Sequence, residues 1–212
     1  MRFNWLFPGA PAIGEVHAGF GHALADGWSQ IQAQLNQACA VGEGGRPPRL
    51  FITGHSLGGA LAVLAATVCS LVPGSLYPVA GVYTYGQPRV ATHEAANTLE
   101  RLFGSRQYRF VNRTDLVPRV PPRSFDYTHT GHAIHFTAPD GYAALEKPEQ
   151  GSLFANAFDD LRGLGRTFKL GTDVKFHLLD GDPGYLATFI AYLKAVEANP
   201  KLREVLKSLL AE

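Results

Sequence analysis

A serine lies between two glycines in the segment from Gly54 to Gly58, which has the pattern G-x-S-x-G. The residues before it, Leu50 to Thr53, are apolar strand formers, and the stretch from Leu57 to Leu71 is rich in Ala and Leu. The pattern therefore predicts a sharp turn between a strand and a helix, with Ser56 at its tip. A serine held in this way is strained and available to substrate, which suits a nucleophile that attacks ester carbonyls.

The same turn predicts how negative charge would be stabilised. The helix after Ser56 points its positive end at the site, and the Leu57 N–H is a natural oxyanion donor. Close approach of the chain around the serine explains the glycines two residues before and after it, Gly54 and Gly58. The alternatives are a glycine-rich turn with an ordinary N-cap serine, or a phosphate-binding loop, for which the chain lacks the spacings G-x-x-x-x-G-K-[ST] and G-x-G-x-x-G.

Four local segments resemble the class 3 lipase family, which includes the filamentous fungal triacylglycerol lipases. They are Val16 to Phe20, Gly54 to Leu61, Tyr83 to Val90 and Arg109 to Pro118. These segments follow the family's order and cover roughly Val16 to Phe136, with a weaker match beyond. The resemblance implies an α/β-hydrolase fold and hydrolysis of acylglycerols or related lipid esters, with no metal or cofactor.

An acid must orient the histidine base, and in this fold it follows a later strand than the nucleophile. Asp115 comes just after the expected strand from Tyr108 to Val111 and matches the family's acid in the pattern N-x-x-D-x-V-P. Asp126 and Asp140 lack a preceding strand. We therefore expect Asp115 to be the acid, with a role as a loop cap as the alternative.

The base follows the acid in chain order, which leaves four histidines: His129, His132, His135 and His177. In the family, the histidine of a Y-x-H-x-G segment is not catalytic, and His129 matches that segment. His177 resembles the family's base, because it lies in an expected loop before Tyr185 and a C-terminal helix. Two departures are Phe176, where the family usually has aspartate, and a longer gap to the tyrosine. A surface histidine is the alternative for His177, with His132 as the substitute base.

Ser56, Asp115 and His177 together predict a serine hydrolase that works through an acyl-enzyme. Its partner would be a lipid or ester substrate, met at a lipid–water interface. A small-ester esterase of the feruloyl type and a non-catalytic lipid-binding protein are the competing functions. We expect His55 to pack behind the turn without a catalytic role, and His17 to be buried and hydrogen-bonded.

The remaining elements must position these residues. Strands at 50–53, 79–85 and 108–111 alternate with helices at 57–71 and 94–103, after a helix at 21–40. This alternation predicts an α/β fold, α/β-hydrolase-like, with a mostly parallel sheet and helices on both faces. Tyr127 to Phe136 suits a short hairpin or an edge strand, and further helices are expected at 153–164, 185–198 and 202–210.

The 212 residues predict a single domain, 1–212, and the formal charge of +1 without a basic stripe predicts no nucleic-acid partner. Cys39 and Cys69 are expected to be free, buried thiols. The sequence shows neither a signal peptide nor a membrane span, so the chain as given is expected to be soluble, unprocessed and cytoplasmic if Met1 is its true start.

The resemblance also implies a missing upstream segment. In the family, a strand ending in G-T or G-S lies before the V-H-x-G-F segment and supplies a second oxyanion donor, but only fifteen residues precede Val16 here. Losing one donor costs roughly 10²- to 10³-fold in rate, so a weak or inactive esterase is expected, with an exposed sheet edge and self-association. The apolar stretches at 3–7 and 153–164 would supply an acyl groove or lid, or ordinary core.

Overall fold

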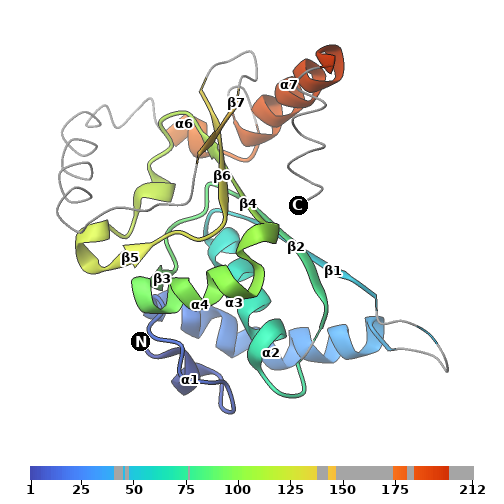
Figure 1. The fold of residues 1–212 in the computed structure, drawn as a ribbon, viewed down its shortest axis with the longest axis vertical. Helices are drawn as coiled ribbons and strands as arrows, with labels where there is room; N and C mark the ends of the chain where they lie inside the picture. The colour runs from blue at the N-terminus through green and yellow to red at the C-terminus, as the bar shows by residue number, and fades with distance from the viewer. Residues whose placement is uncertain are drawn as a thin grey trace.

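The computed structural model describes residues 1–40, 45, 48–75, 77–137, 143–146, 174–180 and 184–200, and a five-stranded sheet in the order β1-β2-β4-β6-β7 lies at its centre (Figure 1). The strands are β1 Leu50–His55, β2 Val79–Tyr85, β4 Gln107–Asn112, β6 His132–Phe136 and β7 Ala143–Glu146. The first four run parallel, and β7 pairs antiparallel with β6. The predicted mostly parallel sheet is confirmed.

Helices lie on both sides of this sheet (Figure 1). One group consists of α1 Phe3–Leu6, α2 Ala18–Ala38, α3 Leu57–Leu71 and α4 His93–Phe103, and the other includes α6 Val174–His177 and α7 Tyr185–Ala198. Val82 of β2 packs with α2, α3 and α4, whereas its neighbours Tyr83 and Tyr85 pack with α7. Successive strand residues point to opposite faces, so the two helix groups cover opposite faces, as predicted.

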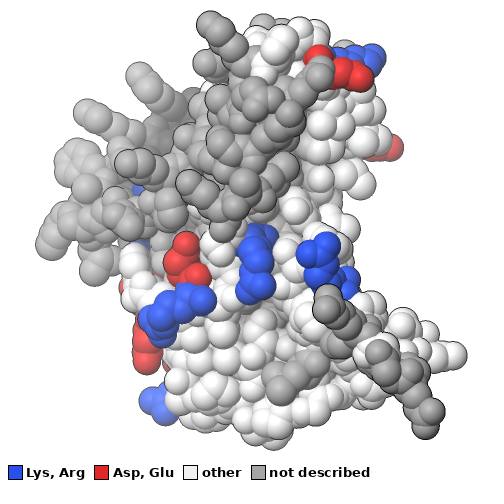
Figure 2. All heavy atoms as spheres, turned by 45° about the vertical axis from the view of Figure 1, so that its right-hand side comes forward, with Lys and Arg blue, Asp and Glu red and all other residues white. Residues whose placement is uncertain are grey.

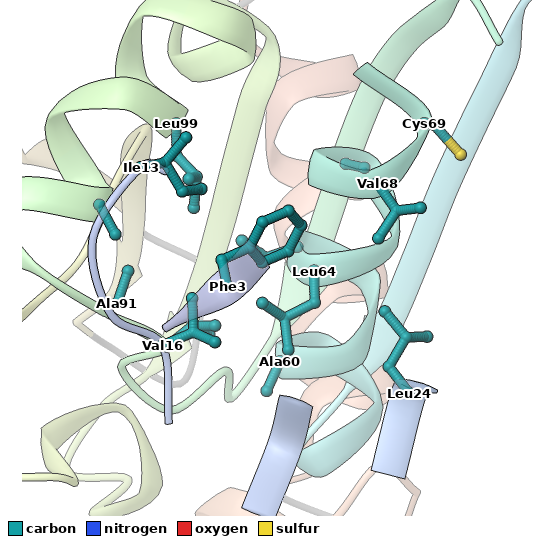
Figure 3. Close-up of a cluster of buried hydrophobic side chains, with 14 of the residues drawn as sticks. Phe3, Ile13, Val16, Leu24, Ala60, Leu64, Val68, Cys69, Ala91 and Leu99 are labelled. Carbon is teal, nitrogen blue, oxygen red and sulfur yellow. The ribbon is translucent and has the colours of Figure 1, made fainter. Parts of the chain in front are cut away.

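The larger hydrophobic core fills the space between α1, α2, α3 and α4 (Figure 3). Phe3 and Phe7 are 0% and 4% exposed and pack there with Leu64 and Trp28, so this N-terminal stretch contributes ordinary core. Trp5, between them, is 67% exposed. Phe3 and Phe7 are four positions apart, so this short helical stretch turns one apolar face to the core and leaves Trp5 outside it.

The segment from Tyr127 to Phe136 differs from the prediction of a hairpin or an edge strand. β5 Tyr127–Thr128 pairs antiparallel with β3 Ala91–Thr92 in a separate two-stranded sheet, and β6 enters the main sheet between β4 and β7. The chain bends at Gly131, which has a φ of 69° and lies so close to Gln107 that a Cβ would stand 2.6 Å from its carbonyl oxygen. The prediction was wrong because a glycine turn separates two strands that have different partners.

The other elements follow the sequence closely. Helices at 57–71 and 185–198 and the strand at 79–85 have the predicted bounds, while α2 begins at Ala18 instead of Gly21. Three short 3₁₀ turns fill the proline-rich loop and the end of α4: η1 Gly104–Arg106, η2 Val117–Arg119 and η3 Arg123–Phe125. The helices predicted at 153–164 and 202–210 lie outside the described residues.

The surface and the cysteines add three further observations. On the face shown in Figure 2, basic side chains are separated by uncharged surface instead of forming one continuous patch. Cys39 and Cys69 are both free, but only Cys69 is buried, so the prediction of two buried thiols was wrong for Cys39, which follows the last residue of α2. Within the described parts of the chain, none of the helices has the length and apolar character needed to cross a membrane.

Candidate active site

Ser56 occupies the predicted turn between β1 and α3. Its backbone has a φ of 55° and a ψ of −126°, a region that costs free energy for a residue with a side chain. The turn is held from behind, because the Ser56 N–H donates a 2.9 Å hydrogen bond to the carbonyl oxygen of Tyr85 in β2. The local sequence thus folds into a strained elbow with Ser56 half-buried at its tip.

Only one of the two glycines flanking Ser56 is required by close packing. A Cβ on Gly54 would overlap the backbone of Gly58, whereas no atom of the described residues would lie within 4 Å of a Cβ on Gly58. The expectation that both positions need glycine was therefore wrong for Gly58. The α carbon of Gly54 lies against the peptide group of Gly58, so of these two positions only Gly54 must lack a side chain.

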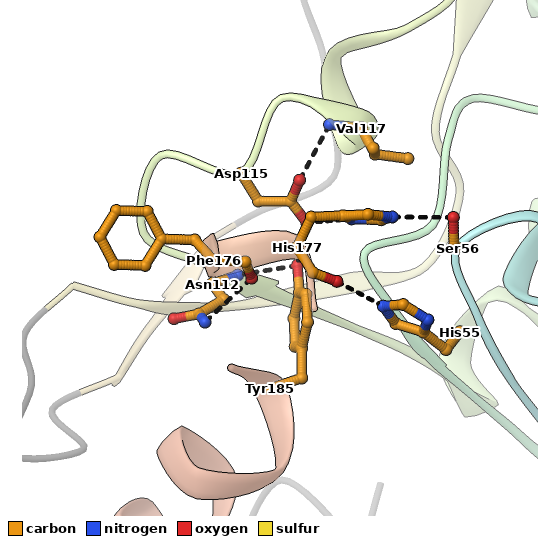
Figure 4. Close-up of polar contacts among 8 residues, drawn as sticks. All are labelled: His55, Ser56, Asn112, Asp115, Val117, Phe176, His177 and Tyr185. Atoms are coloured by element: carbon orange, nitrogen blue, oxygen red, sulfur yellow. Dashed lines mark hydrogen bonds and ion pairs between the residues drawn. The ribbon is translucent and has the colours of Figure 1, made fainter. Parts of the chain in front are cut away.

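The three predicted catalytic residues lie within hydrogen-bond distance of one another (Figure 4). Nε2 of His177 is 2.8 Å from Oγ of Ser56, and Nδ1 of His177 is 2.9 Å from Oδ2 of Asp115. With the proton on Nδ1, the imidazole donates to the carboxylate and accepts from the serine hydroxyl. This arrangement can deprotonate the serine and stabilise the resulting imidazolium.

Asp115 is 1% exposed, and its carboxylate is surrounded by donors. Oδ1 accepts a 3.0 Å hydrogen bond from the Val117 N–H, and Oδ2 accepts from Tyr185 at 2.6 Å as well as from His177. A buried carboxylate requires such partners, because removal from water otherwise penalises its charge. The local turn after β4 and the distant helix α7 therefore both support the acid.

Tyr185 is a component of the site to which the sequence assigned no role. It is the first residue of α7, is 0% exposed, and its hydroxyl also accepts from the Asn112 N–H at 3.0 Å. Burial, followed by the negative charge of Asp115, raises the pKa of Tyr185 well above its usual value, so the phenol stays a neutral donor. The sequence signal was the tyrosine that opens the helix predicted at 185–198.

We expected His177 to lie in a loop. In the structure it is instead the last residue of the short helix α6. The backbone of α6 accepts two side-chain hydrogen bonds, from Asn112 Nδ2 to the Phe176 carbonyl (3.1 Å) and from His55 Nε2 to the His177 carbonyl (2.7 Å). The His55 ring stacks on the His177 ring with centroids 4.8 Å apart. His55, which was expected only to pack behind the elbow, thus contacts the base directly.

The other histidines considered as base are engaged elsewhere. His129 is buried and its Nε2 donates to the Pro118 carbonyl at 2.7 Å, while the His132 ring stacks on Tyr108. His135 donates to the Arg113 carbonyl at 2.7 Å. None of these contacts includes Ser56 or Asp115.

Two other polar residues differ from expectation or lie apart from the site. His17 is half-buried and its Nδ1 is buried without a partner, so the expectation of a buried, hydrogen-bonded histidine was wrong. The ring instead packs against Phe20, with centroids 4.2 Å apart. Asp126 pairs with His93 at 2.8 Å on the exposed surface, and Asp140 lies outside the described residues.

The start of α3 can stabilise an anion. Leu57 is the first residue of this helix, and the N–H groups of a first turn lack acceptors within the helix. Among the described residues, there is no group of three or more His, Cys, Asp or Glu side chains arranged to hold a metal ion. The backbone N–H groups at the start of α3 are therefore the candidate donors for an oxyanion next to Ser56.

Comparison with known proteins gives consistent similarities. The sequence profile described as lipase (class 3) matches residues 3–125. The secreted mono- and diacylglycerol lipase 1 of Fusarium solani is 38% identical over 116 residues, covering 54% of this chain and 32% of that protein. The lipase of Rhizomucor miehei is 34% identical over 130 residues, covering 58% of this chain and 33% of that protein. The chain thus spans about a third of the length of these relatives.

Solved structures show the same similarity. Lipase II from Rhizopus niveus superposes with a TM-score of 0.52 at 28% identity, covering 65% of this chain and 51% of that one. A triacylglycerol lipase whose catalytic centre is described as a serine protease triad superposes with a TM-score of 0.51 at 26% identity, covering 66% and 52%. The fold described above therefore has a counterpart in these lipase structures.

Proposed function

Because the chain belongs to the class 3 lipase family, we propose that it is a serine hydrolase that cleaves carboxylic esters of lipids. Ser56 would be the nucleophile, His177 the base, and Asp115 the acid that orients the base. The pair of hydrogen bonds that connects these three side chains, at 2.8 and 2.9 Å, is the observation that carries the proposal (Figure 4).

The reaction proceeds in two halves. Nε2 of His177 takes the proton from Oγ of Ser56 as the oxygen attacks the ester carbonyl, and the Leu57 N–H with the positive end of α3 stabilises the oxyanion. Collapse of the tetrahedral intermediate breaks the bond to the alcohol, which leaves with the proton from His177. A water molecule, deprotonated by His177, then attacks the acyl-serine and releases the carboxylic acid and free Ser56.

Lipid esters are the proposed substrates. The Fusarium solani relative is named a mono- and diacylglycerol lipase, and relatives from Arabidopsis thaliana and Ricinus communis are named triacylglycerol lipases. On this chain, Leu57 follows the nucleophile and Leu178 and Leu179 follow the base, and all three side chains are about half exposed. Exposed apolar side chains that follow the nucleophile and the base in the sequence favour an acyl chain, and contact with a lipid–water interface, over a charged substrate.

The nucleophile can be tested by replacing Ser56. We expect Ser56→Ala to abolish hydrolysis of a short-chain nitrophenyl ester and labelling by a fluorophosphonate, while Ser70→Ala, near the C-terminal end of α3, preserves both. Persistence of activity and labelling in Ser56→Ala would overturn the assignment. Rates along an ester series from acetate to palmitate then test the substrate class: a rise with chain length at an interface supports lipid esters, and a steady fall indicates a small-ester esterase.

The acid can be tested separately. Asp115→Asn keeps the shape of the side chain but favours the wrong tautomer of His177, so we expect an unchanged fold and a loss of about 10⁴-fold in kcat. Circular dichroism and thermal unfolding serve as the control for folding. A loss of stability that accounts for the loss of activity would indicate that Asp115 acts as a structural cap.

A further inference from the structure

The helix that carries the base is too short to hold itself in place. α6 has four residues, and isolated helices far longer than one turn are marginal in water. The last carbonyl groups of a helix also lack partners within it. The placement of the His177 imidazole 2.8 Å from Ser56 must therefore come from contacts with other parts of the fold.

Two such contacts come from the strands that carry the other catalytic residues (Figure 4). His55 is the last residue of β1, directly before Ser56, and its Nε2 is 2.7 Å from the His177 carbonyl oxygen. Asn112 is the last residue of β4, three positions before Asp115, and its Nδ2 is 3.1 Å from the Phe176 carbonyl oxygen. Each strand thus presents one catalytic residue to the imidazole and one donor to the backbone behind it.

We propose that His55 and Asn112 are positioning residues, which set the distance from the base to the nucleophile and to the acid by binding consecutive carbonyl groups of α6. This inference rests on the proposed function of Ser56 and His177. The two donors lie at the ends of the strands that precede Ser56 and Asp115. Both strands therefore restrain the position of α6, and with it the position of His177 relative to the other two residues.

The chemistry of His55 fits this role. Donation to a carbonyl oxygen requires the proton on Nε2, which fixes the tautomer. Burial is the main cause that lowers the pKa of His55 below its usual value, against the opposing effects of the hydrogen bond to the His177 carbonyl and of the Asp115 charge, so the ring is neutral at pH 7. A neutral ring stacked on His177 does not oppose the positive charge that His177 gains when it takes the serine proton.

A third contact supports the Asn112 side of the frame. The Arg113 guanidinium lies 5.0 Å from the centroid of the Phe176 ring, a favourable cation–π distance. Phe176 stands where the family usually has aspartate, so in this chain an aromatic ring, rather than a carboxylate, precedes the base. The residue next to His177 is therefore bound through its backbone by Asn112 and through its side chain by Arg113.

The test compares two substitutions of His55. His55→Phe keeps an aromatic ring on His177 but removes the donor, and His55→Gln restores a donor. With a soluble nitrophenyl ester, we expect kcat of His55→Phe to fall about 10- to 100-fold with little change in KM, because small misplacements of a catalytic group have effects of this size. His55→Gln should recover most of the rate. His22→Phe, an exposed histidine on α2, is the matched control and should behave like the unsubstituted chain.

A second measurement does not depend on turnover. The Nδ1 proton of His177, hydrogen-bonded to Asp115, should give a low-field proton NMR resonance that is lost in His55→Phe and retained in His55→Gln. Unchanged kcat and an unchanged resonance in His55→Phe would overturn the inference, as would equal damage in both variants. Absence of Ser56-dependent hydrolysis in the unsubstituted chain would instead overturn the proposed function, and the resonance would still test the positioning of the base.

Discussion

The Tyr185 hydroxyl donates a 2.6 Å hydrogen bond to Oδ2 of Asp115, the oxygen that also accepts from Nδ1 of His177. Through this contact the first residue of α7 reaches Asp115, in the turn after β4 and 70 positions earlier in the chain. The same hydroxyl accepts a hydrogen bond from the Asn112 N–H, so Tyr185 binds both Asp115 and the last residue of the strand that precedes it. The C-terminal helix is therefore part of the environment of the acid.

Replacing this phenol should weaken both stability and activity. In Tyr185→Phe, Asp115 loses a donor and the buried Asn112 N–H loses its acceptor, so we expect a loss of about 1.5–3 kcal/mol in the free energy of unfolding. We also expect kcat to fall about tenfold, equivalent to about 1.4 kcal/mol. Urea unfolding and ester hydrolysis measure the two effects. Tyr192→Phe, in the same aromatic cluster, is the control, and equal behaviour of the two variants would contradict the prediction.

Replacing His177 should mainly affect activity, whereas replacing His129 should mainly affect stability. We expect His177→Ala to fold normally and lose hydrolysis by several orders of magnitude, because no base remains next to Ser56. His129→Ala should retain the chemistry but lose about 1–3 kcal/mol of stability, since the buried Pro118 carbonyl is left without its donor. Thermal unfolding and initial rates of both variants check the prediction, and exchanged outcomes would show that the base is misassigned.

The two cysteines should differ in reactivity. Burial raises the pKa of Cys69 to about 12, so almost no thiolate is present at pH 8, and the thiolate is the reacting form. We expect Ellman's reagent to modify the half-buried Cys39 in the native protein and to reach Cys69 only in denaturant. Cys39→Ser should therefore abolish native labelling. Rapid reaction of Cys69 in the folded Cys39→Ser variant would disprove the buried environment assigned to it.

Acid should destabilise the protein partly through His55. Burial lowers the pKa of His55 below the usual 6.5, so below pH 6.5 the unfolded chain takes up a proton that the folded chain resists. The unfolded state then binds more protons, and stability falls as the pH decreases through this range. We expect the melting temperature of His55→Gln to drop less between pH 7 and pH 5 than that of the unsubstituted chain. His22→Gln is the control, and an equal drop in all three proteins would contradict the prediction.

The nucleophile and the acid could be placed from the sequence because each depends on local structure. Ser56 directly follows β1, and Asp115 comes three residues after β4, so the apolar strand patterns, together with the resemblance to the family's motifs, predicted both positions. The parallel sheet followed from the same alternation of elements. His177 needed more information, because its helix is short and only the resemblance, through the later Tyr185, distinguished it from other histidines.

The errors arose where a residue's environment depends on distant parts of the chain. The segment from Tyr127 to Phe136 has the alternation of a hairpin, but β5 pairs with β3, more than thirty residues earlier, which alternation alone cannot predict. Gly58 occupies the position at which the pattern predicts a required glycine, but the close contact would be made by a Cβ on Gly54 and not by one on Gly58. The hydrogen bonds of His55 and Asn112 to α6 join positions 122 and 64 residues apart, and no local pattern specifies them.

His177 follows Asp115 by 62 positions and Ser56 by 121. A ribosome that adds 5–20 residues per second would therefore synthesise the base roughly 3 to 12 seconds after the acid. During that interval the proposed nucleophile has no group to deprotonate it, and Asp115 lacks the hydrogen bonds from His177 and Tyr185. The proposed triad would thus be complete only once α6 and α7 pack against the strands, so we expect shorter nascent chains to be inactive. Ribosome-bound chains stalled before His177 should accordingly resist a fluorophosphonate that labels the released protein.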